Sequence, residues 1–202
     1  VGDSLKVWTS QPNGTTEMLT GAGNDTNNRI IVPNGLSGSY YLGGINADFN
    51  SFNEAVNVID SLGVCGPITV YVNDSIYDEQ IQIPNFTNSS EVNTVKFTSL
   101  SGNNTNSGIV FTNSGSNNNY AVNFSGAQNI IFSNLMLSNN GTSYGNVLYF
   151  SGSSNILIDS CLIVGDSTSP TSSTNKTLVR GYYDNGNSEK CIFSNNTFNY
   201  GS

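Results

Sequence analysis

Carboxylates and one arginine are the side chains that could take part in acid–base chemistry. Asp78 and Glu79 are the one adjacent acidic pair in residues 36–202, and Arg180 is the one arginine there. Neighbouring side chains on a strand point to opposite faces, so this pair is not expected to act together. The acidic residues of the C-terminal part fall at different registers: Asp159, Asp166, Asp184 and Glu189. The sequence therefore predicts no catalytic site, and Arg180 is interpreted as a solvated or paired surface charge.

Histidine is absent from the 202 residues, which excludes Ser-His-Asp and Cys-His catalysis, His-ligated zinc and a histidine pH switch. Cys65, Cys161 and Cys191 have the spacing of neither a zinc site nor a dense disulfide framework, so we interpret them as small buried thiols and leave any disulfide pairing open. Because the chain is acidic, calcium is the one cofactor to consider. No loop supports a calcium site, because residues 21–27 resemble a plain Asn/Gly turn and residues 43–48 resemble a calcium repeat only in composition. We therefore expect no cofactor.

The composition is unusual in its low charge. Charged residues make up 10% of the chain and the formal net charge is −8, which disfavours nucleic acid as a partner. Solubility depends instead on 33 Asn and 29 Ser, which form helices poorly, while 10 Phe and 10 Tyr supply apolar surface for a core. No stretch approaches the roughly 20 apolar residues of a membrane span, so no membrane insertion is expected.

One helix is predicted, over residues 52–62, from apolar residues at three- and four-residue spacing. Ser51 and Glu54 fit a capping box at its start, and Gly63 fits its end. From residue 68 onward, strands of three to five residues alternate with Asn/Ser/Gly turns. The chain is therefore predicted to be all-β apart from this helix.

An internal repeat defines the architecture. Residues 121–137 align without a gap on residues 147–163, at an offset of 26, and residues 191–198 match residues 130–137 at an offset of 61. The third copy thus carries about nine extra residues, which we place in residues 167–176. A repeat of this length with three short strands predicts a right-handed parallel β-helix, one repeat per coil.

The offset also predicts which side chains stack between coils. Equivalent residues of successive coils lie one above the other at about 4.8 Å, and stacked amides hydrogen-bond along the axis while like charges repel. The predicted columns are Phe124 with Phe150, Ile130 with Ile156 and Cys191, Asn129 with Asn155 at a turn, and Asp159 between Ser133 and Ser194.

Residues 1–35 are predicted to form a separate small β segment, the end of a preceding β-sandwich domain, because their short apolar runs cannot bury a core. Val1 is interpreted as an internal start. The β-helix of residues 36–202 is predicted to be truncated at residue 202, with more coils following, because a solenoid end exposes an unpaired backbone edge.

Two loops are candidates for binding. Residues 138–145 and 165–177 leave their coils at equivalent registers and are expected to emerge on the same side. Tyr144, Tyr182 and Tyr183 lie nearby in sequence and are candidate glycan contacts, because tyrosine stacks on sugar rings and its hydroxyl forms hydrogen bonds. The alternative is that these loops only cover a flank of the solenoid.

The segment at residues 40–49, the capped helix, residues 62–67 and residues 77–81 together resemble a module of very large secreted surface proteins of the Bacteroidota. In that module an amphipathic helix caps a pectin-lyase-like right-handed parallel β-helix, and the likeness covers residues 36–202. The resemblance implies export by the type IX route and a location on the outer surface of a bacterial cell. It also implies O-glycosylation at Asp-Ser motifs, with candidate sites Ser4, Ser61, Ser75 and Ser167.

Two functions follow as expectations. The first is a structural or adhesive segment of a giant extracellular protein, an adhesin, attachment or appendage scaffold. Its expected partners are other domains of the same chain, identical subunits of an appendage, and surface glycans or cells. The alternative is the N-terminal part of a polysaccharide lyase or glycoside hydrolase whose catalytic coils lie beyond residue 202. Paired carboxylates or acidic calcium ligands on one face of those coils would favour the enzyme.

Overall fold

The computed structural model describes residues 4–7, 27–30, 35–168, 174–182 and 188–200. The chain divides into two compact units, Val1–Asn34 and Gly35–Ser202. In the first unit β1 (Ser4–Val7) pairs antiparallel with β2 (Asn27–Ile30), with Ser4 opposite Ile30. Residues 31–34, which follow β2, lie outside the described residues.

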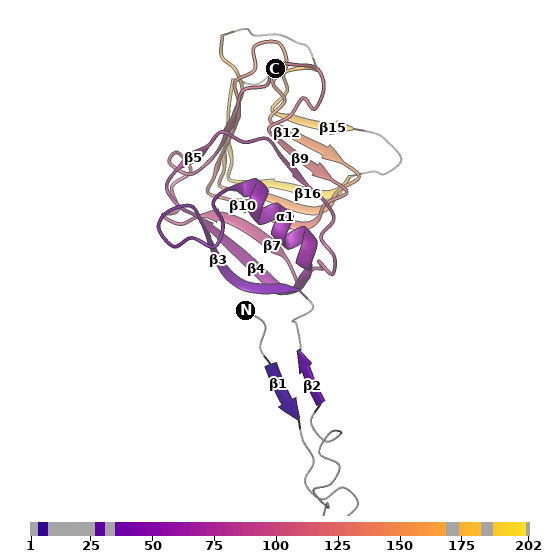
Figure 1. The fold of residues 1–202 in the computed structure, drawn as a ribbon. Coiled ribbons are helices and arrows are strands. Elements are labelled where there is room, and N and C mark those ends of the chain that lie inside the picture. Colours follow the sequence, from indigo (N-terminus) through magenta and orange to yellow (C-terminus); the bar gives the residue numbers. More distant parts are fainter. Residues whose placement is uncertain (1–3, 8–26, 31–34, 169–173, 183–187, 201–202) are drawn as a thin grey trace, which may run out of the picture. The chain divides into compact units, whose positions relative to one another are not determined.

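The second unit is a parallel β-helix built from three sheets (Figure 1). The first sheet contains, in chain order, β3 (Leu36–Leu42), β4 (Val64–Val72), β7 (Val95–Ser99), β10 (Gln128–Ser133), β13 (Ser154–Asp159) and β16 (Glu189–Ser194). The second contains β5 (Ile76–Tyr77), β8 (Gly108–Phe111), β11 (Met136–Asn139), β14 (Leu162–Val164) and β17 (Thr197–Asn199). The third contains β6 (Ile81–Ile83), β9 (Val122–Ser125), β12 (Leu148–Ser151) and β15 (Val179–Tyr182).

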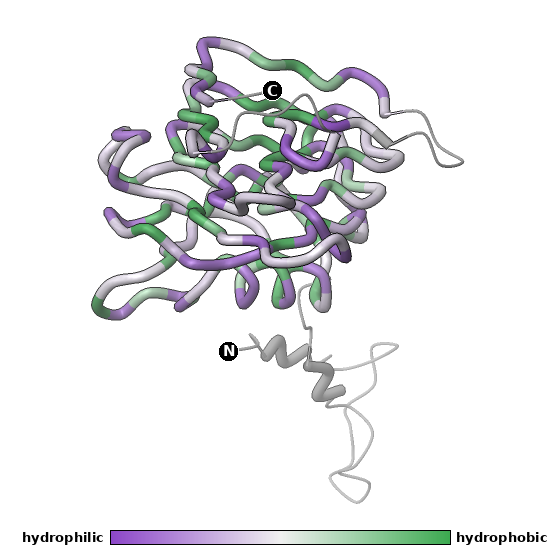
Figure 2. Tube along the Cα trace, turned by 90° about the horizontal axis from the view of Figure 1, so that it is seen from above, coloured by the Kyte–Doolittle hydropathy of each residue, from purple (hydrophilic) through white to green (hydrophobic). Residues whose placement is uncertain are grey.

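From β4 onward, successive strands go to the first, second and third sheets in turn, and each pairs parallel with its equivalents in the neighbouring coils. This order confirms the prediction of a parallel β-helix with one repeat per coil. In each of the three short strands of a coil, every second side chain points inward, and most of these inward residues are apolar. Figure 2 shows apolar and polar residues alternating along the coils.

The helix α1 (Phe52–Leu62) forms as predicted and packs against β3 and β6 at the N-terminal end of the coils. Ser51 accepts a hydrogen bond from the Glu54 backbone N–H through its Oγ at 3.0 Å, which is half of a capping box. The other half differs from the prediction, because Glu54 Oε2 accepts from the backbone N–H of Asn50 at 2.7 Å. Gly63 ends the helix with φ +71°, a conformation that favours glycine.

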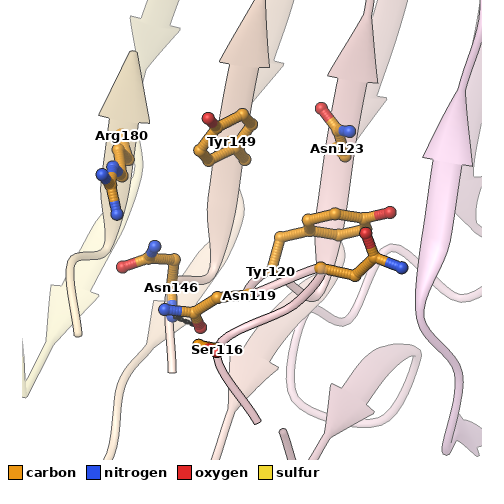
Figure 3. A pocket seen from close by; sticks show the side chains of 8 residues that line it. Ser116, Asn119, Tyr120, Asn123, Asn146, Tyr149 and Arg180 are labelled. Atoms are coloured by element: carbon orange, nitrogen blue, oxygen red, sulfur yellow. Dashed lines mark hydrogen bonds between the residues drawn. The ribbon is translucent and has the colours of Figure 1, made fainter. Parts of the chain in front are cut away.

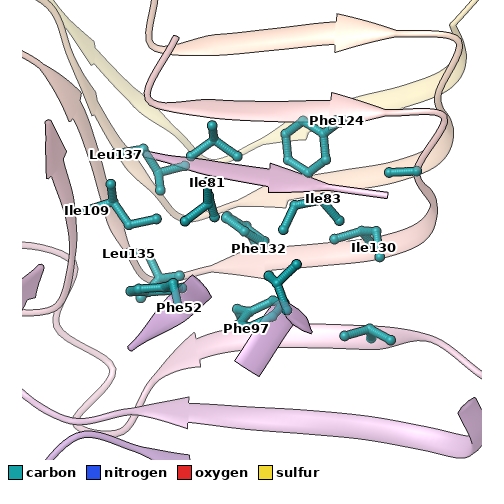
Figure 4. Close-up of a cluster of buried hydrophobic side chains, with 14 of the residues drawn as sticks. Phe52, Ile81, Ile83, Phe97, Ile109, Phe124, Ile130, Phe132, Leu135 and Leu137 are labelled. Carbon is teal, nitrogen blue, oxygen red and sulfur yellow. The ribbon is translucent and has the colours of Figure 1, made fainter. Parts of the chain in front are cut away.

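The core consists of stacked columns of inward side chains (Figure 4). Phe124 lies opposite Phe150 in the third sheet, with ring centroids 4.8 Å apart and planes at 19°, as predicted. Ile130, Ile156 and Cys191 also share one register position, as predicted. On the outer face of the first sheet Asp159 lies between Ser133 and Ser194, so no acidic stack forms there.

Asparagine forms a column between coils where the backbone is left-handed. Asn155 Nδ2 donates to Asn129 Oδ1 at 3.2 Å, which confirms the predicted pair. Its place differs from the prediction, because both residues lie inside strands of the first sheet, with φ of 54° and 59°, and not at a turn. Asparagine tolerates this conformation better than most residues, so backbone geometry accounts for asparagine at both positions.

The extra residues of the fourth coil are divided between two loops. Paired residues differ by 26 at Ser138 and Val164, by 31 at Leu148 and Val179, and by 35 at Ser154 and Glu189. The chain therefore gains residues between Val164 and Val179 and again between Tyr182 and Glu189. The prediction that all of them lie in 167–176 is wrong. The short strand at 179–182 pairs with β12 and so divides the extra residues between two loops, which the sequence did not reveal.

Candidate functional site

Several carboxylates of the β-helix have structural partners. Glu79 Oε1 accepts from the backbone N–H of Phe52 at 2.9 Å, and Glu79 Oε2 accepts from that of Asn53 at 2.9 Å. Two of the free N–H groups at the start of α1 are thereby satisfied, and a negative charge lies at the positive end of the helix. Asp159 accepts from Asn195 Nδ2 at 3.0 Å. Asp184 lies outside the described residues.

Asp166 and Lys176 form an ion pair within the 165–177 loop. Each side chain is 6% exposed, and Asp166 also accepts from the backbone N–H and hydroxyl of Thr168. Hydrogen bonds from Lys176 and Thr168 hold the pKa of Asp166 well below its usual range. The pair ties together the start and end of a loop whose residues 169–173 lie outside the described part.

Metal binding has no support among the described residues, where no group of three or more His, Cys, Asp or Glu side chains could hold an ion. Asp48, in the segment that resembles a calcium repeat in composition, accepts from the Tyr41 backbone N–H at 2.8 Å. The segment at 21–26 lies outside the described residues. Among the described helices none is long and apolar enough to cross a membrane.

A pocket of about 310 Å³ lies on the outer face of the third sheet (Figure 3). The parallel register brings together three of its residues, Asn123 of β9, Tyr149 of β12 and Arg180 of β15, which occupy one outward column. A loop before β9 and the residue Asn146 before β12 complete it. The lining residues are Ser116, Asn118, Asn119, Tyr120, Asn123, Asn146, Tyr149 and Arg180.

Two tyrosine rings and the arginine form one wall of this third-sheet pocket. The ring centroids of Tyr120 and Tyr149 lie 6.2 Å apart with planes at 36°. The guanidinium carbon of Arg180 lies 5.8 Å from the Tyr149 centroid, within the range of a cation–π contact. Arg180 Nη1 also donates to the carbonyl of Thr174 at 2.8 Å. The backbone carbonyl of Thr174 thus holds the Arg180 guanidinium beside the Tyr149 ring.

Asparagine side chains fix the floor of the pocket by binding backbone groups across coils. Asn119 Oδ1 accepts from the Asn146 backbone N–H at 3.1 Å, and Asn119 Nδ2 donates to the Asn175 carbonyl at 2.8 Å. Asn146 Oδ1 accepts from the backbone N–H of Thr177 at 2.8 Å and from its hydroxyl at 3.0 Å. These bonds join three successive loops, so the floor is set before any ligand binds.

Two amide atoms in the pocket lack a hydrogen-bond partner, Asn123 Oδ1 and Asn146 Nδ2. Asn146 is fully buried and Asn123 is 9% exposed. A buried polar atom without a partner costs about 1–3 kcal/mol, so such atoms are uncommon in native structures. In the described part of the chain, Ser89 Oγ is the only other buried side-chain atom of this kind. Both atoms have almost no solvent-accessible surface, so they belong to the packed floor of the pocket and are not groups that a ligand reaches directly.

Of the three tyrosines expected to contact a glycan, only the side chain of Tyr144 is described. Tyr144 is half-buried in its loop and is not among the lining residues, the side chain of Tyr182 is not described, and Tyr183 lies outside the described residues. The structure assembles Tyr120 and Tyr149 instead. The 26-residue offset pairs Asn123 with Tyr149, so the repeat alone predicts that these two of the eight lining residues are neighbours. The candidate modification sites Ser61, Ser75 and Ser167 are exposed, and the side chain of Ser4 is not described.

The pocket has the chemistry of a binding site. None of the described lining residues is Asp, Glu, His or Cys, so no such side chain lies in the pocket to activate the hydroxyl groups of Ser116, Tyr120 and Tyr149. The lining residues supply aromatic faces, amide donors and acceptors, and one guanidinium. This combination suits a ligand with hydroxyl or amide groups and an apolar face.

Comparison with known proteins gives a limited match. No protein-family model and no curated protein matches this chain. Two solved structures resemble it, both of the pectin methylesterase from Aspergillus niger, in a deglycosylated and a penultimately deglycosylated form. Each is 16% identical in sequence with a TM-score of 0.40, and the match covers 81% of this chain and 59% of the esterase chain. The class that the sheets define is that of the parallel β-helix proteins.

Proposed function

We propose that this chain is a structural and adhesive segment of a large extracellular protein, and that its third-sheet pocket binds a saccharide of a surface glycan. The observation that carries the proposal is the pocket itself, where the rings of Tyr120 and Tyr149 adjoin the amide side chains of Asn118 and Asn119. Sugars offer hydroxyl groups for such amides and C–H faces for aromatic rings. The coils supply the rigid support that an adhesive surface needs.

The wider setting is part of the same proposal. The resemblance of residues 36–202 to modules of Bacteroidota surface proteins supports a bacterial cell surface, the type IX route, and partners that are further domains or identical subunits. Exposure of Ser61, Ser75 and Ser167 supports O-glycosylation at these residues. An extracellular location is also consistent with a surface that depends on uncharged Asn and Ser.

The test is binding of the 202-residue chain to an array of bacterial, plant and animal glycans. We expect retention of a subset of glycans and no cleavage of the corresponding soluble polysaccharides. Retention of no glycan would contradict the binding proposal. Release of reducing ends or unsaturated products would replace it with an enzymatic function.

A further inference from the structure

We propose that the ligand of the third-sheet pocket is an acidic sugar, whose carboxylate binds the guanidinium of Arg180. This inference rests on the proposed saccharide binding and names the class of sugar. Arg180 is the one charged side chain among the described lining residues, and no carboxylate is among them. The pocket therefore presents a positive charge to a ligand that enters it.

Arg180 has no ion pair in the described part of the chain, although carboxylates are plentiful. The sequence has 14 Asp and Glu against 6 Lys and Arg. The ion pairs among the described residues join Lys176 with Asp166 and Lys190 with Glu91. Neither involves Arg180. An arginine that lines a pocket without a carboxylate partner leaves its charge available to a ligand.

Two contacts fix the Arg180 guanidinium before a ligand binds. Its Nη1 donates to the Thr174 carbonyl at 2.8 Å, and its central carbon lies 5.8 Å from the centroid of the Tyr149 ring. Figure 3 shows Arg180 and Tyr149 on the adjacent strands β15 and β12, where they are paired in register. Because the guanidinium is already ordered, binding an anion costs less side-chain entropy.

The remaining N–H groups of Arg180 have the geometry of a carboxylate site. Apart from the Thr174 contact, the guanidinium makes no hydrogen bond with the described residues, so Nε and Nη2 keep their N–H groups. These two atoms lie on one edge of the planar group and donate in parallel, which matches the two oxygens of a carboxylate. Arg180 and Tyr149 are each only partly buried, so both retain surface that a ligand can contact. In this they differ from the buried amides of Asn123 and Asn146.

Exposed polar side chains in the same pocket suit the hydroxyl groups of a sugar. Ser116 and Asn118 are exposed, and neither side chain has a hydrogen-bond partner among the described residues. The Asn118 carbonyl accepts from Gln80 Nε2 at 2.6 Å and from the Tyr120 backbone N–H at 2.9 Å, which fixes this loop. Sugar hydroxyl groups both donate and accept, so a serine hydroxyl and an asparagine amide can bind them.

The negative net charge makes any preference for acidic sugars informative. At a formal charge of −8 the chain as a whole repels acidic glycans, so nonspecific attraction to them is not expected. Exposed charges more than about 8–10 Å apart are largely screened at physiological salt, whereas a carboxylate on the guanidinium is in direct contact. A preference for acidic sugars therefore requires a local cation, and among the described lining residues that cation is Arg180.

The first experiment compares matched sugars on the full 202-residue chain. The pairs are the methyl glycosides of glucuronic acid and glucose, and of galacturonic acid and galactose, measured by titration calorimetry and saturation-transfer NMR. We expect the acidic member of at least one pair to bind about tenfold more tightly, because hydrogen bonds to a charged group are stronger than neutral ones. Equal or weaker binding of the acidic member in both pairs overturns this inference alone, whereas absence of any saccharide binding overturns the proposed function as well.

A sulfated sugar distinguishes a carboxylate site from a site for any anion. The methyl glycoside of glucose 6-sulfate is titrated beside the glucuronide. We expect the glucuronide to bind more tightly, because the planar carboxylate matches the two parallel N–H donors of the guanidinium. Binding of the sulfated sugar that is as tight or tighter overturns the assignment of a carboxylate.

The second experiment removes one positive charge at each of two strand positions. Arg180→Gln deletes the cation of the pocket, so we expect the ratio of acidic to neutral sugar affinity to fall to about one. Lys96→Gln is the control, because Lys96 is a partly buried cation of β7 that is not a lining residue. We expect Lys96→Gln to keep the ratio of the parent chain. A ratio that is unchanged in Arg180→Gln, or lost equally in both variants, overturns the inference.

A third substitution protects the test against misfolding. Arg180→Lys keeps a cation at the same position but lacks the two parallel N–H donors, so we expect the ratio to fall by at least about threefold. Thermal unfolding checks that each variant folds, and Arg180→Lys replaces Arg180→Gln if the latter does not. An unchanged ratio in Arg180→Lys overturns the inference that the guanidinium binds the carboxylate.

Discussion

Glu79 caps the helix that begins at Phe52, with its Oε1 accepting the Phe52 backbone N–H at 2.9 Å. The carboxylate comes from a turn between β5 and β6, so the contact joins the first complete coil to the helix that covers the core. Phe52 is fully buried and packs edge-on against Tyr77 at 5.3 Å. Glu79, one half of the only adjacent acidic pair in residues 36–202, therefore stabilises the N-terminal end of the β-helix.

Replacing this carboxylate tests its structural role. We expect Glu79→Ala to lower the free energy of unfolding by about 1–2 kcal/mol, because two backbone N–H groups lose a charged acceptor near the helix start. Chemical denaturation followed by circular dichroism measures the change. Asp78→Asn is the control, since Asp78 is an exposed neighbour that also carries a carboxylate. An equal effect of both substitutions would show that net charge, and not the cap, is responsible.

The stacked pair Phe124 and Phe150 gives a prediction for the core. Phe124 is fully buried in a column that continues from coil to coil, so truncation leaves a cavity that the stiff backbone ladder cannot close. We expect Phe124→Ala to lower the free energy of unfolding by about 3–5 kcal/mol, and Phe124→Leu to cost clearly less. Urea denaturation measures both. Similar small losses for both variants would indicate a loosely packed core.

The core columns were predictable from the sequence because equivalent residues of successive parallel coils lie directly above one another. A gapless offset between two repeats translates directly into contacts, so the pairs Phe124 with Phe150 and Asn129 with Asn155 follow from alignment alone. The Glu79 contact was not predictable in this way. Its partner Phe52 belongs to the helix, which is not part of any repeat, so no offset relates the two positions.

The pocket likewise contains residues that the repeat predicts to be neighbours and residues that it does not. Asn123 and Tyr149 are related by the repeat, whereas Asn119 and Tyr120 come from a loop without an equivalent of the same length in the preceding coil. The fold of that loop depends on hydrogen bonds to Asn146 and Asn175. The loops at 138–145 and 165–177 therefore pointed to the wrong tyrosines, because the pocket takes Tyr120 from another loop and Tyr149 from β12.

The role of the Tyr120 and Tyr149 rings in the pocket can be tested by removing one of them. We expect Tyr149→Ala to reduce binding of any glycan retained by the parent chain by at least tenfold, because the central stacking surface is lost. Tyr41→Ala is the matched control. Tyr41 is also an outward tyrosine of a strand, 48% exposed and stacked on Tyr71 at 5.7 Å, but it is not a pocket residue. Unchanged glycan affinity in Tyr149→Ala would show that glycans bind elsewhere.

Cys161 makes stability sensitive to alkaline pH. Its thiol is fully buried, and burial raises its pKa from 9.0 to about 11. Between these values the unfolded chain loses this proton while the folded chain retains it, so the folded state is progressively disfavoured as pH rises from about 9 to about 11. The two-unit shift corresponds to at most about 3 kcal/mol. Below pH 9 the thiol is protonated in both states and its contribution is constant.

Denaturation at a series of pH values with and without this thiol measures the effect. Cys191 and Tyr77 also have a pKa raised by burial, so the parent chain carries their contributions in addition. We therefore compare the parent with Cys161→Ala, which retains both groups. The difference in unfolding free energy between the two chains is expected to be constant up to about pH 9 and to shrink toward pH 11. A difference that does not change over this range would show that the Cys161 thiol ionises in the folded protein as readily as in the unfolded chain, and hence that water reaches it between the coils.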